Sequence, residues 1–125
     1  MKIIKITIKT EARTKKNSSR IITAKGRTML IPSKPYLEFE KNCKPFLKPL
    51  KIDYPINLKC IFYMKTRRKV DLPNLLNSIC DVLVKHQVID DDNKDIVASF
   101  DGSRVKYDKE NPRIEIEIER SKDDE

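Results

Sequence analysis

The sequence predicts an α+β fold in which two helices pack on one face of a mixed β-sheet. Apolar and polar residues alternate over 2–9, 55–64 and 112–120, which is the period of a strand with one buried face. Over 72–84, apolar residues instead recur every three or four positions, as in an amphipathic helix. We expect one domain over 1–120, followed by an acidic, frayed tail at 121–125.

The N-terminal half is predicted to hold one strand, an arm and a short helix. In the strand, Ile4, Ile6 and Ile8 share one face. Residues 10–32 are rich in lysine and arginine and show little apolar periodicity, so they are interpreted as a loop or arm. Phosphate contact and solvated flexibility explain this arm equally well. Ser33 is the expected N-cap of a short helix, which Pro45 limits in length.

The C-terminal half is predicted to contain a strand, the main helix and three further strands. Asp71 is placed as the N-cap of the main helix, with Pro73 in its first turn and His86 capping its end. The turn chemistry around Gly102 predicts a hairpin that joins a strand at 96–100 to a partner beginning at Arg104.

The charge balance favours an anionic partner. The chain has 27 Lys and Arg against 19 Asp and Glu, a formal net charge of +8, which points to nucleic acid more than to a membrane surface. No apolar run approaches the roughly 20 residues of a membrane span, and the N-terminus lacks the apolar core of a signal peptide. The three cysteines have no paired spacing, and there is one histidine, so buried thiols in a reducing compartment are expected and zinc is not. We therefore expect a cytoplasmic protein.

Aspartates cluster at two places in this basic chain, Asp71 and the run 90–92. A helix cap and a solvated turn explain them without any chemistry, and spacing alone favours that explanation. Paired carboxylates can instead hold Mg²⁺ or Mn²⁺ and present it to a phosphate. The helix between the two places spans roughly 20 Å, so they meet only if the chain after His86 folds back towards the helix start.

The stretch "RRKVDLPNLLNSICDVLVKHQVIDDDNKDI", residues 67–96, resembles the core motif of the RusA-type Holliday-junction resolvases. Asp71 and Asn74 match the first aspartate and the asparagine of that motif, and Asp81 falls in its Asp-Ala-Leu segment. Asp91 and Asp92 match its closing aspartate pair. The later segment "DGSRVKYDKENPR" is similar to a phage subgroup of the same family.

This resemblance implies the RusA-like fold and a homodimer that binds four-way DNA junctions and nicks opposing strands with Mg²⁺ or Mn²⁺. It places Asp71, Asp91 and Asp92 at catalytic, metal-binding positions, with Asn74 and Lys94 as auxiliary candidates. We expect DNA phosphates to be held by the basic residues before the helix and in the arm. These are Arg67, Arg68, Lys69, Arg13, Lys15, Lys16 and Arg20.

Two positions depart from the family motif. Pro73 stands where the family has its second aspartate, and Asn77 stands where it has a lysine. The leading hypothesis is a metal-dependent endonuclease that resolves Holliday junctions or other branched DNA in recombination and repair. The alternative is an inactive RusA-like protein that binds junctions, and a third possibility is a small interaction protein for RNA or another protein.

Overall fold

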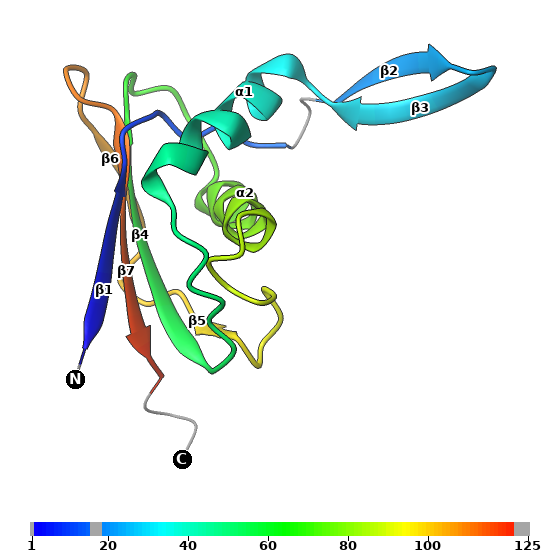
Figure 1. Cartoon of the computed structure of the whole chain (residues 1–125). Coiled ribbons are helices and arrows are strands. Elements are labelled where there is room, and N and C mark those ends of the chain that lie inside the picture. The colour runs from blue at the N-terminus through cyan, green and yellow to red at the C-terminus, as the bar shows by residue number, and fades with distance from the viewer. Residues whose placement is uncertain (1, 16–18, 122–125) are drawn as a thin grey trace.

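The computed structural model describes residues 2–15 and 19–121 and consists of a five-stranded sheet, a separate hairpin and helices on one face of the sheet (Figure 1). Met1 and most of the expected acidic tail, residues 122–125, lie outside the described residues. The elements in chain order are β1 (Ile3–Ile8), β2 (Ser19–Ala24), β3 (Arg27–Pro32), α1 (Lys34–Cys43), the 3₁₀ helix η1 (Lys44–Phe46), β4 (Ile56–Met64), α2 (Leu72–Lys85), β5 (Val97–Ser99), β6 (Arg104–Tyr107) and β7 (Arg113–Arg120).

The sheet is mixed, as the sequence predicts. Its order is β1-β7-β4-β5, and β6 also pairs with β4. β7 lies antiparallel to β1 and to β4, whereas β5 and β6 run parallel to β4. Both helices lie on the same side of this sheet, so the predicted α+β arrangement is confirmed (Figure 1).

The core lies between β4, β7 and the apolar side of α2. Every second residue of β4 is buried from Ile56 to Met64, because successive side chains of a strand point to opposite faces. Ile79 and Leu83 of α2 are fully buried against this face. All three cysteines are buried and free, as expected. Within residues 2–15 and 19–121, no helix is long and apolar enough to cross a membrane.

The prediction of a hairpin around Gly102 is wrong. β5 and β6 do not pair with each other but follow one another along the same edge of β4. Asn57 of β4 holds the connection in place, because its side chain accepts from the amide of Asp101 at 2.8 Å and donates to its carbonyl at 3.1 Å. Ser103 then accepts the amide of Cys60 at 3.0 Å. These contacts carry the chain across the edge of β4 instead of reversing it.

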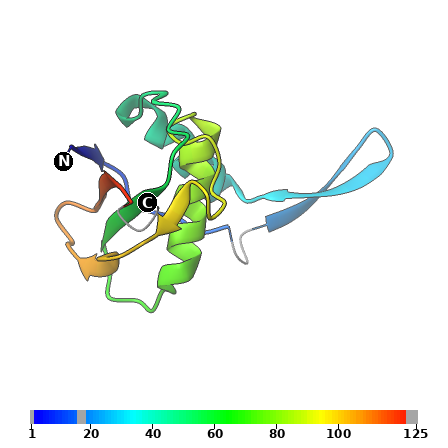
Figure 2. The same ribbon diagram turned by 90° about the horizontal axis from the view of Figure 1, so that it is seen from below.

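The basic arm holds a hairpin that the sequence interpretation did not resolve. β2 and β3 pair antiparallel from Ser19 opposite Pro32 to Ala24 opposite Arg27. Lys25 and Gly26 form the turn with φ of 53° and 74°, the left-handed pair that a tight hairpin requires. The hairpin forms its own two-stranded sheet and projects away from the body of the domain (Figures 1 and 2).

Candidate functional site

A polar stripe runs along α2 and fixes the segment that follows β1. Its members are spaced by three or four residues, so they share one side of the helix. They are Asp71, Asn74, Ser78, Asp81 and Lys85. Ser78 is buried, and its hydroxyl donates to the backbone carbonyl of Arg13. The stripe thus places the start of the basic arm against α2.

Two ion pairs extend this contact. Lys15 Nζ lies 3.2 Å from a carboxylate oxygen of Asp81, and Lys85 pairs with the buried carboxylate of Glu40 in α1. Lys15 also lies 5.2 Å from the centre of the Tyr36 ring. The arm and α1 are therefore held on the same side of α2.

Asp71 is the N-cap residue of α2, as expected, but its carboxylate does not cap the helix. One oxygen accepts from the side-chain amide of Asn74 at 3.3 Å, and the aspartate remains exposed. Pro73 and Asn77, the two departures from the motif, are exposed as well. Asp71 thus presents an exposed carboxylate at the helix start.

After α2 the chain folds back along the helix. His86 is the C-cap, as expected, and its ring nitrogen Nε2 lies 3.1 Å from the carbonyl of Glu40. Val88 then donates its amide to the carbonyl of Leu83 at 2.9 Å. Ile89 forms a parallel bridge with Ile52, whose carbonyl accepts the amide of Asp90 at 2.8 Å. The aspartate run is thereby carried back beside α2.

The result is a group that we call the acidic edge, formed by Asp81, Asp91 and Asp92. Asp91 accepts the amide of Asp92 at 2.7 Å and the side-chain amide of Asn93 at 3.1 Å. Asp92 is an exposed residue, but partial loss of solvent around its carboxylate raises its pKa, and so do a hydrogen bond with Asp91 and the charges of Asp81 and Asp91. Burial likewise raises the pKa of the Cys80 thiol to about 12, and Asp92 and Asp81 add to this effect. Like charges therefore accumulate here without full compensation.

The structure places Asp91 and Asp92 side by side, but Asp71 is not among the charges that act on Asp92. Asp71 precedes Asp81 by ten residues on the helix, a rise of roughly 15 Å. Among residues 2–15 and 19–121, no three His, Cys, Asp or Glu side chains form a group that could hold a metal ion. Mg²⁺ commonly takes one or two carboxylates and completes its shell with water. The acidic edge fits a water-rich ion of this kind and does not fit a cage of three protein ligands.

The candidate DNA-binding residues fall into separate places. Arg13 and Arg68 line one cavity, while Lys15 pairs with the acidic edge. Arg67 stacks over the ring of Tyr107 at 4.0 Å, and Lys69 is exposed.

Three candidates remain. Lys94 pairs with Asp95 at 2.8 Å. Lys16 and the side chain of Arg20 lie outside the described part of the structure.

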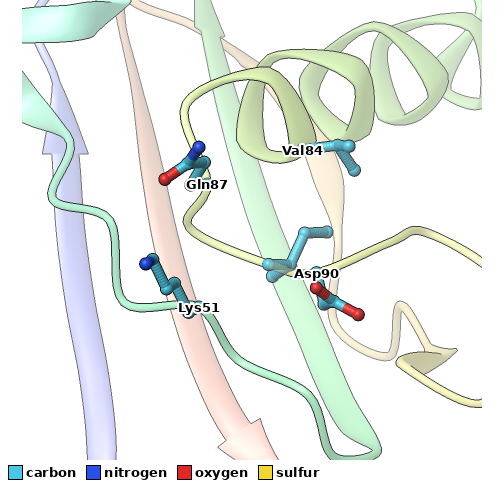
Figure 3. Close-up of a pocket in the computed structure, with 5 residues that line it drawn as sticks. Lys51, Val84, Gln87 and Asp90 are labelled. Carbon is cyan, nitrogen blue, oxygen red and sulfur yellow. The ribbon is translucent and has the colours of Figure 1, made fainter.

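A separate pocket of about 400 Å³ opens at the end of α2 (Figure 3). Lys51, Gln87 and Asp90 line it together with Val84 and Ile89. Lys51 and Gln87 both have positive φ, and the amide of Lys51 donates to the carbonyl of Gln87 at 2.9 Å. Because Asp91 and Asp92 do not line this pocket, it is distinct from the acidic edge.

Sequence reasoning did not propose Asp81 as a site residue. The signal was present in the polar stripe, since Asn74, Ser78 and Asp81 follow one another at helical spacing in a mostly apolar segment. Ser78 and Asp81 both contact the basic arm, which no local pattern reveals.

Carboxylates bordered by arginine and lysine on one surface are typical of proteins that act on phosphodiesters. The family described as "Endodeoxyribonuclease RusA" matches residues 9–119 of the 125-residue chain. The chain belongs to this family of endodeoxyribonucleases, as its motif indicates. No curated protein matches the sequence significantly.

Asparagine at position 92 is expected to raise stability at neutral pH. The folded state raises the pKa of Asp92, so its ionised form opposes folding at pH values above the folded pKa. This cost is relieved as pH falls through the folded pKa and is absent below the unfolded value of about 3.8. Thermal melts should therefore give Asp92→Asn the higher Tm at pH 7 and an equal Tm at pH 3. Asp95→Asn, which loses only an exposed ion pair, serves as the control and should change little.

Proposed function

We propose that this protein is a metal-dependent endonuclease that nicks branched DNA, with the four-way junction as its substrate. The observation that supports this most is the acidic edge, which lies beside the basic start of the arm in a member of the RusA family. In this proposal the scissile phosphate approaches Asp91 and Asp92, while Arg13, Lys15 and Arg68 hold neighbouring phosphates.

Mg²⁺ or Mn²⁺ is the proposed cofactor. When bound, the ion supplies a Lewis acid for the phosphodiester and a water of lowered pKa. Asp91 and Asp92 would hold it, and Asp81 adds negative charge behind them. Their mutual repulsion would favour a cation, because a bound cation relieves the cost that raises the pKa of Asp92. Asp71 and Asn74 would then contact water or DNA at the other end of α2.

We further propose that the protein works as a homodimer in recombination or repair. A four-way junction offers two equivalent strands, so two copies of one acidic edge related by a two-fold axis would nick them symmetrically. The proposal of a homodimer is motivated by membership of the RusA family.

A second candidate function is junction binding without cleavage. It is favoured by Pro73 and Asn77, which remove a carboxylate and a cation from the motif, and by the lack of a three-ligand group within the described residues. This protein would bind junctions in a salt-sensitive manner, and its binding would not depend on Asp92.

The test is cleavage of a synthetic four-way junction in Mg²⁺ or Mn²⁺, compared with a linear duplex of the same length and with a chelator control. The proposed endonuclease gives paired nicks in the junction and little cleavage of the duplex. Binding to the junction with no nicks in either metal would support the second function instead. Equal binding to junction and duplex would reject both.

A further inference from the structure

A second cavity lies at the base of the hairpin, between the segment after β1 and the start of α1. It has a volume of about 210 Å³. Arg13 and Arg68 line it, as do Ser33 and Tyr36 at the start of α1, and no acidic residue does. At roughly 30 Å³ for each water molecule, this space holds a phosphate group together with water.

Two hydroxyl groups at this cavity are buried without hydrogen-bond partners. The Tyr36 side chain is 1% exposed, and neither its hydroxyl nor that of Ser33 has a partner within the described residues. The hydroxyl of Ser78 lies near enough to Tyr36 to lower its pKa a little, but it donates to the carbonyl of Arg13 and does not meet hydrogen-bond geometry with the Tyr36 hydroxyl. Ser33 occupies the N-cap position but makes no capping bond. Buried polar groups are ordinarily satisfied, because leaving one unpaired costs about 1–3 kcal/mol, and two unpaired hydroxyls at one cavity point to a missing acceptor.

The start of α1 adds a further preference for an anion. The helix has ten residues, no acidic residue in its first turn, and amides there that lack intrahelical partners. The N-terminal end of such a helix carries partial positive charge, which attracts anions.

The charges around the cavity also favour an anion. Arg68 has no ion pair in the part of the chain that the structure describes. Three acids of this region are each paired with a cation. Glu11 pairs with Arg13 at 3.2 Å, Asp81 pairs with Lys15 at 3.2 Å, and Glu40 pairs with Lys85. Burial holds the pKa of Tyr36 well above its usual range, and Glu40 and Asp81 add to this, so its hydroxyl remains a donor. Two guanidinium groups, two hydroxyls and a helix N-terminus together match an ion with several acceptor oxygens.

We propose that this cavity binds a phosphate group, and that the group is a backbone phosphate of the DNA strand that continues to the acidic edge. Identifying the phosphate as one of DNA rests on the proposed function. Arg13 lines the cavity, and Lys15, two residues later, contacts Asp81 of the acidic edge. Pro32 ends the hairpin next to Ser33. A DNA strand bound at this cavity would therefore also pass the base of the hairpin. Ser33 and Tyr36 are therefore positioning residues that set where the strand lies relative to Asp91 and Asp92.

The test measures binding of a labelled single-stranded oligonucleotide in chelator at fixed low salt, which separates it from any cleavage. Tyr36→Phe and Ser33→Ala should each weaken binding about tenfold, since each removes a hydrogen bond to a charged group. The ligand-free Tm of Tyr36→Phe should not fall, because the lost hydroxyl has no partner. Tyr54→Phe is the matched control, since Tyr54 precedes β4 and lies more than about 27 Å along that strand from Met64 at the cavity. It should bind as the wild type does.

Two further arms identify the source of the phosphate. An oligonucleotide with neutral methylphosphonate linkages should lose the sensitivity to Tyr36→Phe, and inorganic phosphate should compete only weakly with DNA. If Tyr36→Phe and Ser33→Ala both keep wild-type affinity for DNA and for inorganic phosphate alike, the cavity is not a phosphate site. If both variants instead lose binding of inorganic phosphate but not of DNA, the DNA assignment is overturned. Neither result depends on whether the wild-type protein cuts junctions.

Discussion

Replacing Asp92 with asparagine is expected to lower the rate of junction nicking on the order of 100-fold, with little change in metal-free junction binding. Asp92 is the member of the acidic edge on which burial and two neighbouring carboxylates act together. Removing its charge removes the attraction for a cation at the point where the proposed scissile phosphate lies. Single-turnover nicking in saturating Mg²⁺ or Mn²⁺ measures this directly.

Asp95→Asn is the matched control for that experiment. It makes the same chemical change three residues away, at an exposed carboxylate that pairs with Lys94. The control should nick at nearly the wild-type rate. Equal rates for Asp92→Asn and the wild type would reject the acidic edge as the site of cleavage.

Replacing Phe62 with alanine is expected to cost about 3–5 kcal/mol in the free energy of unfolding. Phe62 is 0% exposed in β4, which lies inside the sheet between β7 and the edge strands. The substitution removes an aromatic ring from the layer between the sheet and α2, and neighbouring side chains can fill the space only in part. Urea denaturation followed by circular dichroism gives the value.

Val105→Ala in β6 serves as the comparison, because Val105 is an exposed apolar residue on the same sheet. Its effect should stay within about 0.5 kcal/mol. A cost below about 1 kcal/mol for Phe62→Ala would contradict the packing described for β4.

The central part of the fold could be predicted because its signals are local. Alternation from Ile56 to Met64 identifies β4, and the apolar side of α2 is visible from Leu75 to Leu83. A strand with one buried face and a helix with one apolar side leave few ways to pack together.

The edge of the sheet could not be predicted in this way. β5 has only three residues, and the turn at Gly102 has the composition of a hairpin. The path of the chain through this turn is set by Asn57, which lies more than forty residues earlier. Its side-chain amide forms hydrogen bonds with the backbone of Asp101. A distant side chain thus overrides local turn chemistry.

The candidate site, too, is predictable in part from local sequence and in part depends on distant contacts. The aspartates at 71, 91 and 92 are identifiable from the family motif, and Asp91 and Asp92 lie together because they are adjacent in the chain. The return of the chain along α2 depends on the bridge between Ile52 and Ile89, which no spacing rule predicts. This return sets Asp92 near Asp81, about ten residues along the helix from Asp71.

This arrangement gives one of the two departures from the motif, Pro73, a physical meaning. Pro73 removes a carboxylate at the start of α2, and the carboxylates that repel one another are gathered further along the helix, at Asp81, Asp91 and Asp92. We therefore predict that the metal-binding centre of this protein lies at the acidic edge rather than at Asp71 alone.

The most direct test is to locate Mn²⁺ by anomalous diffraction in crystals soaked with the ion. We expect a peak within coordination distance of Asp91 or Asp92, and loss of that peak in Asp92→Asn. A peak at Asp71 with none at the acidic edge, or no peak under conditions in which the protein nicks junctions, would contradict it.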